Sequence, residues 1–197
     1  HCNAPRAGEW CLTLADFKQL KGDIEYTELI ASEYISRAEI ERVRNNMYVA
    51  INGGTMEPIP NRYQRASRLT YDAAIAYRTA FEFYGFLSDT TDMYVLTPYR
   101  FRDFSYRGNT FRYLKPRLEP QFGVVTNSSG VTVTTIERTV VDCIDLLGKA
   151  ITLHDLLASI SQISTFDTTK MIKCLEKYNK QFLWQKTGFI LQYHSSI

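Results

Sequence analysis

The side chains best suited to hydrolytic chemistry in this sequence are three carboxylates, Glu137, Asp142 and Asp145. They lie in one stretch of helical periodicity, where residues eight apart such as Glu137 and Asp145 share a face. Carboxylates grouped in this way could hold a divalent metal for phosphodiester cleavage. Arg138 stands four residues before Asp142, and this spacing favours an ordinary ion pair. We favour the ion pair, so we assign no catalytic residue and no metal site, and we expect no enzyme.

Other catalytic motifs are missing from the sequence. The three histidines, His1, His154 and His194, are widely separated, and two of them lie near the chain ends. There is no Gly-x-Ser-x-Gly nucleophile turn, no His-Glu-x-x-His motif and no glycine-rich phosphate loop. None of the four cysteines belongs to a Cys-x-x-Cys pair, which argues against a zinc ribbon. We therefore expect no cofactor.

Arginine is the residue type that is concentrated in one part of the chain. The formal net charge is +2, but residues 1–60 carry six basic and nine acidic side chains, a net of −3. Residues 61–117 carry ten basic side chains, nine of them Arg, and five acidic ones, a net of +5. Arg suits planar, bidentate contacts with phosphate. The middle block is therefore a candidate nucleic-acid surface, with a solvated, ion-paired surface as the alternative.

The overall composition is that of an ordinary globular chain. The 197 residues are 45% hydrophobic and 22% charged. No window approaches 18 uninterrupted apolar residues, and the first residues contain no apolar signal segment. We expect no membrane partner and a cytoplasmic location.

Pro58 and Pro60 divide the chain into two predicted segments, residues 1–58 and 59–197. In the first, Leu14–Leu20 and Tyr26–Ser32 have short helical patterns. Ser36 with Glu39 matches a capping box and predicts a third helix. A strand at residues 48–51 and a return strand at 55–57 would form a hairpin. Helices followed by a two-stranded ribbon are the order of a winged helix-turn-helix, whose last helix enters the major groove of DNA.

This organisation predicts a set of DNA-contacting side chains. Five lie on or just after the predicted recognition helix, three recur every three residues after Pro60, and five more are arginines of the basic block. The candidates are Ser36, Arg37, Arg42, Arg44, Asn45, Arg62, Arg65, Arg68, Arg78, Arg100, Arg102, Arg107 and Arg112.

The second segment mixes helices and strands. A helical stripe is predicted from Ala73 to Tyr84, and a strand at residues 93–96. Two hairpins are predicted, one with strands 101–106 and 110–114 and one with strands 123–126 and 131–134. Helical patterns follow to the end of the chain. The predicted fold class is α+β: an N-terminal winged helix-turn-helix and a mixed domain with antiparallel hairpins and C-terminal helices.

Several runs, in the same order, resemble the AbiEi-type antitoxins, which are transcriptional regulators of type IV toxin–antitoxin pairs. The runs are Ile35–Ile40, Tyr48–Ile51 with Gly53 and Gly54, Asn61–Leu69, Ala76–Gly85, Tyr94–Thr97, Glu137–Asp145 and Gln185–Leu191. Matches of this kind extend from about Ile24 to Leu191.

The resemblance implies a winged helix at residues 1–58 that binds the promoter of its own operon, and an α/β antitoxin domain at residues 59–197. It also implies a nucleotidyltransferase toxin as partner. Members of the family often continue beyond the last matching run, which implies that Ile197 is a truncated end. The net negative charge of the first segment is unusual for a DNA-binding unit. Binding to DNA phosphates would need additional arginines from the second segment. The oligomeric state stays open.

Two other functions fit the same residues. The first is a protein-interaction module with a winged helix that no longer binds DNA, in which the aromatic hairpin around Phe104 and Phe111 docks the toxin. The second is a metal-dependent nuclease built on Glu137, Asp142 and Asp145.

Overall fold

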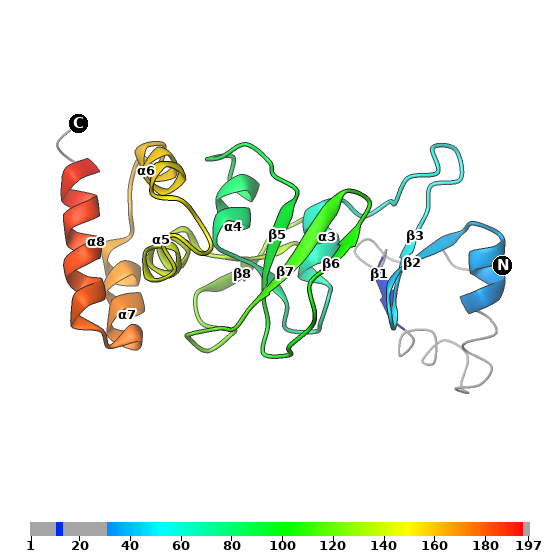
Figure 1. Cartoon of the computed structure of the whole chain (residues 1–197), viewed down its shortest axis with the longest axis horizontal. Coiled ribbons are helices and arrows are strands. Elements are labelled where there is room, and N and C mark those ends of the chain that lie inside the picture. Colours follow the sequence, from blue (N-terminus) through cyan, green and yellow to red (C-terminus); the bar gives the residue numbers. More distant parts are fainter. Residues whose placement is uncertain (1–10, 14–30, 195–197) are drawn as a thin grey trace.

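The structure is a computed structural model that describes residues 11–13 and 31–194. It is an α+β fold in which three layers follow one another along the longest axis of the molecule (Figure 1). A small three-stranded sheet lies at one end, a six-stranded sheet in the middle, and a group of helices at the other end. Of the predicted first-segment helices, Leu14–Leu20 and most of Tyr26–Ser32 lie outside the described residues.

The small sheet is built from β1 (Cys11–Thr13), β2 (Ile40–Arg44) and β3 (Met47–Ala50). Its order is β1-β3-β2, and both pairs are antiparallel, with Cys11 opposite Val49 and Ile40 opposite Ala50. Residues 31–36 are helical and lead directly into β2. A helical segment followed by a hairpin, with β1 closing the sheet, is therefore the described N-terminal arrangement.

The prediction that Ser36 begins a helix is wrong. The helix ends there: the Ser36 hydroxyl donates to the Glu33 carbonyl at 2.7 Å, and Ala38 adopts a left-handed φ of 57°. Ile40 and Val43 suggested a helix because they are three residues apart. They lie on the strand β2 and are buried on its two opposite sides: Ile40 packs with Ala31 and Tyr48, and Val43 packs with Met47 and Val49.

The predicted hairpin at residues 48–57 is also displaced along the chain. Its first strand is present as β3, but the return strand is reduced to a single bridge between Ile51 and Pro58. The hairpin is instead β2–β3, which turns at Asn45 and Asn46. Asn46 has a φ of 60°, a left-handed conformation that Asn tolerates better than most residues.

The central sheet has the strand order β6-β7-β5-β4-β9-β8. Its strands are β4 (Ala74–Ile75), β5 (Asp92–Leu96), β6 (Phe104–Tyr106), β7 (Asn109–Leu114), β8 (Val124–Thr126) and β9 (Thr132–Thr134). Both predicted hairpins are present as the antiparallel pairs β6–β7 and β8–β9. β5 runs parallel to β7, and β4 runs antiparallel to β5 and parallel to β9.

The predicted helical stripe from Ala73 to Tyr84 is correct only in its second half. Ala74 and Ile75 form β4, and the helix α4 spans Arg78–Phe83. Between them, Tyr77 has a φ of 54°, which separates the strand from the helix. A short, fully buried apolar strand has no alternation that would distinguish it from a helix.

Five further helices complete the fold. They are α3 (Arg62–Ser67), α5 (Ile136–Asp145), α6 (Leu153–Ser161), α7 (Thr168–Tyr178) and α8 (Gln181–His194). Four of these, α3, α5, α6 and α7, begin with side-chain caps; at α6 the Thr152 hydroxyl accepts from the Asp155 amide at 3.1 Å.

Two large apolar cores lie on opposite faces of the central sheet. One packs α4 to α8 and includes Phe81, Ile144 and Leu156. The other joins β2, β3 and α3 to the sheet, so that Val49 and Phe111 belong to one cluster. This second core therefore crosses the predicted boundary between residues 58 and 59.

Candidate nucleic-acid interface

The predicted recognition residues lie on three different parts of the small sheet unit. Ser36 and Arg37 end the helical segment, and Arg37 forms an ion pair with Glu33. Arg42 lies exposed on β2 and donates to the Asn45 side chain at 2.8 Å. The last three candidates of this group, Arg42, Arg44 and Asn45, therefore belong to a hairpin and not to a recognition helix.

Arg44 and Arg65 face inward. The Arg44 guanidinium donates to the Leu69 carbonyl at 2.6 Å and lies 5.4 Å from the Phe101 ring centroid. Arg65 is buried, donates to the Pro60 carbonyl at 2.9 Å and lies over the Tyr106 ring. Burial lowers the pKa of both guanidinium groups from their ordinary value. These two arginines hold the small sheet and α3 against the central sheet.

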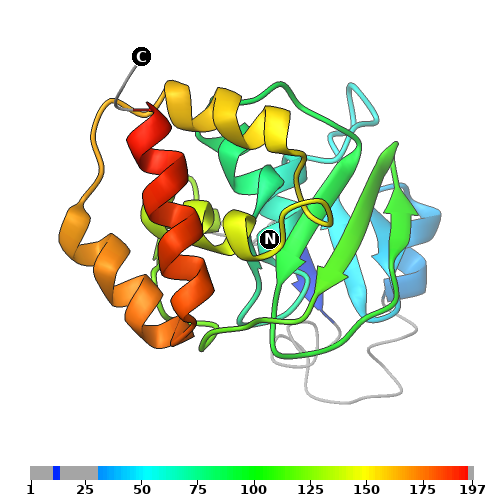
Figure 2. The same cartoon turned by 60° about the vertical axis from the view of Figure 1, so that its left-hand side comes forward.

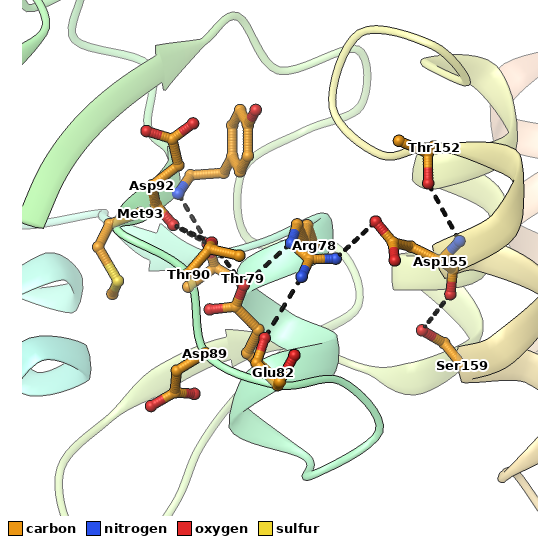
Figure 3. Close-up of polar contacts among 12 residues, drawn as sticks. Arg78, Thr79, Glu82, Asp89, Thr90, Asp92, Met93, Thr152, Asp155 and Ser159 are labelled. Atoms are coloured by element: carbon orange, nitrogen blue, oxygen red, sulfur yellow. Dashed lines mark hydrogen bonds and ion pairs between the residues drawn. The ribbon is translucent and has the colours of Figure 1, made fainter.

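Arg62 and Arg78 converge on one buried acid. The Glu82 carboxylate, whose side chain is fully buried, lies 2.8 Å from Arg62 and 3.1 Å from Arg78, and it also accepts from the Thr90 hydroxyl. Figure 3 shows Arg78 between Glu82 of α4 and Asp155 of α6, which lies 2.9 Å from it. Burial raises the pKa of Glu82, against the opposing effects of Thr90 and both arginines. This cluster joins helices and leaves neither arginine free for a ligand.

Arg107 and Arg112 are ion-paired at the surface. Arg107 lies in the β6–β7 turn and contacts Glu41 at 2.5 Å and Glu57 at 3.7 Å. Its hydrogen bonds lower the pKa of Glu41 from the ordinary value. Arg112 lies 2.9 Å from Asp92 on the neighbouring strand. For these two residues the ion-paired surface is the better description.

Four candidates remain exposed and make no ion pair with any residue that the structure describes: Arg42, Arg68, Arg100 and Arg102. Lys115, which the sequence did not single out, has the same properties. Arg68 precedes β4, Arg100 and Arg102 follow β5, and Lys115 follows β7. β5 and β7 are parallel, and β4 is antiparallel to β5. The end of β5, the end of β7 and the start of β4 therefore meet at one end of the central sheet, which carries Arg68, Arg100, Arg102 and Lys115.

The β2–β3 turn lies near this end of the sheet. Arg44, just before the turn, reaches Leu69 next to Arg68 and covers Phe101 between Arg100 and Arg102. A hydrogen bond of 2.6 Å joins the hydroxyls of Thr70 and Thr97. Figure 2 shows the loop that carries residues 97–103 running along the bottom of the sheet from the end of β5 to the start of β6. The β2–β3 hairpin therefore contacts this end of the central sheet through Arg44.

The carboxylates proposed for a nuclease already have partners. Asp142 is buried between Arg138, at 3.2 Å, and the Tyr178 hydroxyl, at 2.5 Å. Glu137 accepts from the Asp167 amide, and Asp145 pairs with Lys180. Within residues 11–13 and 31–194, no three His, Cys, Asp or Glu side chains form a group that could hold a metal ion.

The aromatic hairpin proposed to dock a toxin is not an open surface. Phe111 is fully buried, and Phe104 stacks on it with ring centroids 4.9 Å apart. The Arg44 guanidinium lies over Phe104, 5.9 Å from the ring centroid. These rings pack the central sheet against the small sheet.

Comparison with known proteins shows a similarity at the level of the fold. No family model matches the chain, and no curated protein matches it. The fold is similar to the crystal structure of the RV2827C protein from Mycobacterium tuberculosis, with a TM-score of 0.66 and 12% sequence identity. The similarity covers 93% of this chain and 72% of that one. At this identity the match shows a shared fold only.

None of the helices within the described ranges has both the length and the apolar character that crossing a bilayer requires.

Proposed function

We propose that this protein is a DNA-binding antitoxin that represses its own operon. The observation that carries the proposal is the order of elements in the N-terminal unit. Helical residues 31–36 lead into the β2–β3 hairpin, which β1 completes as a three-stranded sheet. This is the order of the last helix and the wing in a winged helix-turn-helix unit. The helix that ends at Ser36 then takes the place of the recognition helix.

Exposed cations next to the hairpin support contact with duplex DNA. Arg42 and Asn45 lie at the wing, and Arg68, Arg100 and Arg102 lie beside it at the end of the central sheet. Phosphate neutralisation by Lys and Arg supplies much of the affinity for DNA. The sheet end thereby supplies the positive charge that the acidic first segment lacks.

The antitoxin part of the proposal comes from the resemblance to AbiEi-type antitoxins. The partner is then a nucleotidyltransferase toxin encoded beside this gene, and the protein acts by binding and not by catalysis. The operator and the target of the toxin would follow from the operon itself.

The test is binding to the DNA upstream of the gene, measured by fluorescence anisotropy over a salt series. Arg42→Ala and the pair Arg100→Ala/Arg102→Ala should weaken binding, and each lost phosphate contact should reduce the salt slope by about one unit. Arg112→Ala is the matched control, because Arg112 is ion-paired to Asp92. Binding without sequence preference, or a salt slope near zero, would contradict the proposal.

A protein-interaction module is the second candidate function. The observation that favours it is that several candidate arginines already contact groups of the protein itself and not a ligand. These are Arg37, Arg44 and Arg107. In that case the product of the neighbouring gene would co-purify with this chain in a pull-down, and the upstream DNA would not shift.

A further inference from the structure

Two tyrosines project from the same end of the central sheet as the free cations. Tyr71 is 99% exposed and Tyr99 is 60% exposed. Tyr71 follows Thr70 and Tyr99 follows Thr97 by two residues, and those two threonines are hydrogen-bonded at 2.6 Å. A fully exposed aromatic ring contributes nothing to the core of the chain. Single exposed apolar residues are common, but two rings placed together among cations are a candidate binding surface.

The loop that carries Tyr99 is anchored from within. The Phe101 ring packs edge-on against Tyr113, with centroids 5.6 Å apart, and lies under the Arg44 guanidinium. Its neighbours Arg100 and Arg102 are exposed. The Tyr99 amide also donates to the Thr97 hydroxyl at 3.3 Å. The position of this loop is therefore set by packing, which lowers the entropy cost of binding a ligand.

The charge at this end is positive on balance. Arg68, Arg100, Arg102 and Lys115 make no ion pair with a described residue. The two nearby acids are engaged elsewhere: Asp72 accepts from the Gln121 amide, and Asp103 accepts from the Tyr113 amide and contacts Arg112. The surface thus combines aromatic rings with four cations, and Asp72 is the one carboxylate of these two that no ion pair with a described residue neutralises.

We propose that this surface binds single-stranded nucleic acid. Exposed rings offer faces on which unpaired bases stack, and the surrounding cations neutralise the phosphates between those bases. A duplex keeps its bases stacked inside and cannot use the rings in this way. The two proposals share Arg68, Arg100 and Arg102, but Tyr71 and Tyr99 lie outside the winged-helix unit and belong to the single-strand proposal alone.

The experiment measures binding of the full chain to fluorescein-labelled oligo(U) and oligo(dT) of about 12 nucleotides, a length within the site size of small single-strand binders. Tyr71→Ala/Tyr99→Ala should weaken binding of one or both strands at least about tenfold, because each base stack is worth several-fold in affinity. Tyr71→Phe/Tyr99→Phe should retain binding, since the rings remain. Comparison of the two oligonucleotides distinguishes RNA from DNA as the ligand.

Controls separate this proposal from the proposed function. Phe189→Ala removes another exposed ring, 73% exposed on α8 at the far end of the molecule, and should change nothing. Affinity for the upstream duplex should stay within about twofold in the tyrosine pair variant, while Arg42→Ala should weaken the duplex only. If the full chain binds the oligonucleotides but not the upstream duplex, the promoter proposal is refuted and the single-strand proposal is not. No binding to either oligonucleotide, or equal binding by the alanine pair, would overturn it.

Discussion

The buried pair of Arg138 and Asp142 is the residue-scale feature with the largest expected energy. Arg138 is fully buried and donates to the Pro120 carbonyl as well as to Asp142. Asp142→Ala would leave the guanidinium charge buried without its counterion, which costs about 3–5 kcal/mol in the free energy of unfolding. Urea denaturation measures this loss.

Asp89→Asn is the control for that variant, because Asp89 is an exposed partner, 3.8 Å from Arg62. Such surface pairs contribute about 0–1 kcal/mol. A loss of less than about 1 kcal/mol for Asp142→Ala would show that Arg138 finds a replacement partner in the folded chain.

Cys11 gives a residue-scale prediction for pH dependence. Burial raises the pKa of its thiol to about 12, although Arg68 and Arg65 oppose the shift. The thiolate is the reactive form, so alkylation by iodoacetamide at pH 8 should be at least about 100-fold slower than for a free cysteine of pKa about 8.5. The rate should rise about tenfold per pH unit up to the raised pKa.

The measurement for Cys11 is mass spectrometry of each cysteine peptide, with urea-unfolded protein as the reference. Equal rates in the folded and unfolded chains would place Cys11 in solvent and would contradict its position in β1.

The partner that each arginine contacts could not be predicted from its position in the sequence alone. The i,i+4 spacing correctly predicted the pair of Arg138 and Asp142. The same spacing fits Arg78 with Glu82, but it gave no sign that Arg62, 20 residues before Glu82, would share that carboxylate. Contacts between distant segments depend on the strand order, and this order is not encoded in local spacing. That is why the free cations could be identified only in the folded chain.

At the scale of elements, the β2–β3 turn contains a residue with an unfavourable backbone conformation. Asn46 adopts a φ of 60°, which is left-handed. Asn46→Gly should change the free energy of unfolding by only a few tenths of a kcal/mol, whereas Asn46→Val should lower it by about 1–2 kcal/mol, because a β-branched side chain disfavours this conformation. Urea denaturation of both variants measures the difference. Equal stability would show that the turn readily adopts another conformation.

Local patterns predicted the elements well where period and turn signals agreed. β5, the hairpins β6–β7 and β8–β9, and helices α5 to α7 follow directly from alternation, glycine turns and apolar stripes. The two strands that were predicted as helix, β2 and β4, were missed for a common physical cause. β2 buries Ile40 on one side and Val43 on the other, and β4 is fully buried, so neither strand shows the two-residue alternation that reveals a strand. In both places helix-like spacing was left as the only visible signal.

At the scale of the whole molecule, the shared core predicts cooperative unfolding. Val43, Met47 and Val49 of the small sheet pack in one cluster with Ile75 and Phe111 of the central sheet. The full chain should therefore unfold in a single transition, with circular dichroism and fluorescence changing together. Two separate transitions would show that the small sheet is an independent unit.

A fragment of residues 59–197 tests the same point. It would expose the face of the central sheet that the small sheet covers, so we expect it to bind a hydrophobic dye and to unfold at lower urea than the full chain. A fragment as stable as the full chain would contradict the shared core.

The core between the two sheets also has a consequence for synthesis of the chain. Residues 43–51 pack against partners as late as Val133, which a ribosome adds only several seconds later at about 5–20 residues per second. Until then the hairpin lacks the surface that covers it, and its apolar face and strand edges are open to other nascent chains. Newly made copies should therefore depend on chaperones most strongly during this interval, and slower translation after residue 51 should increase aggregation.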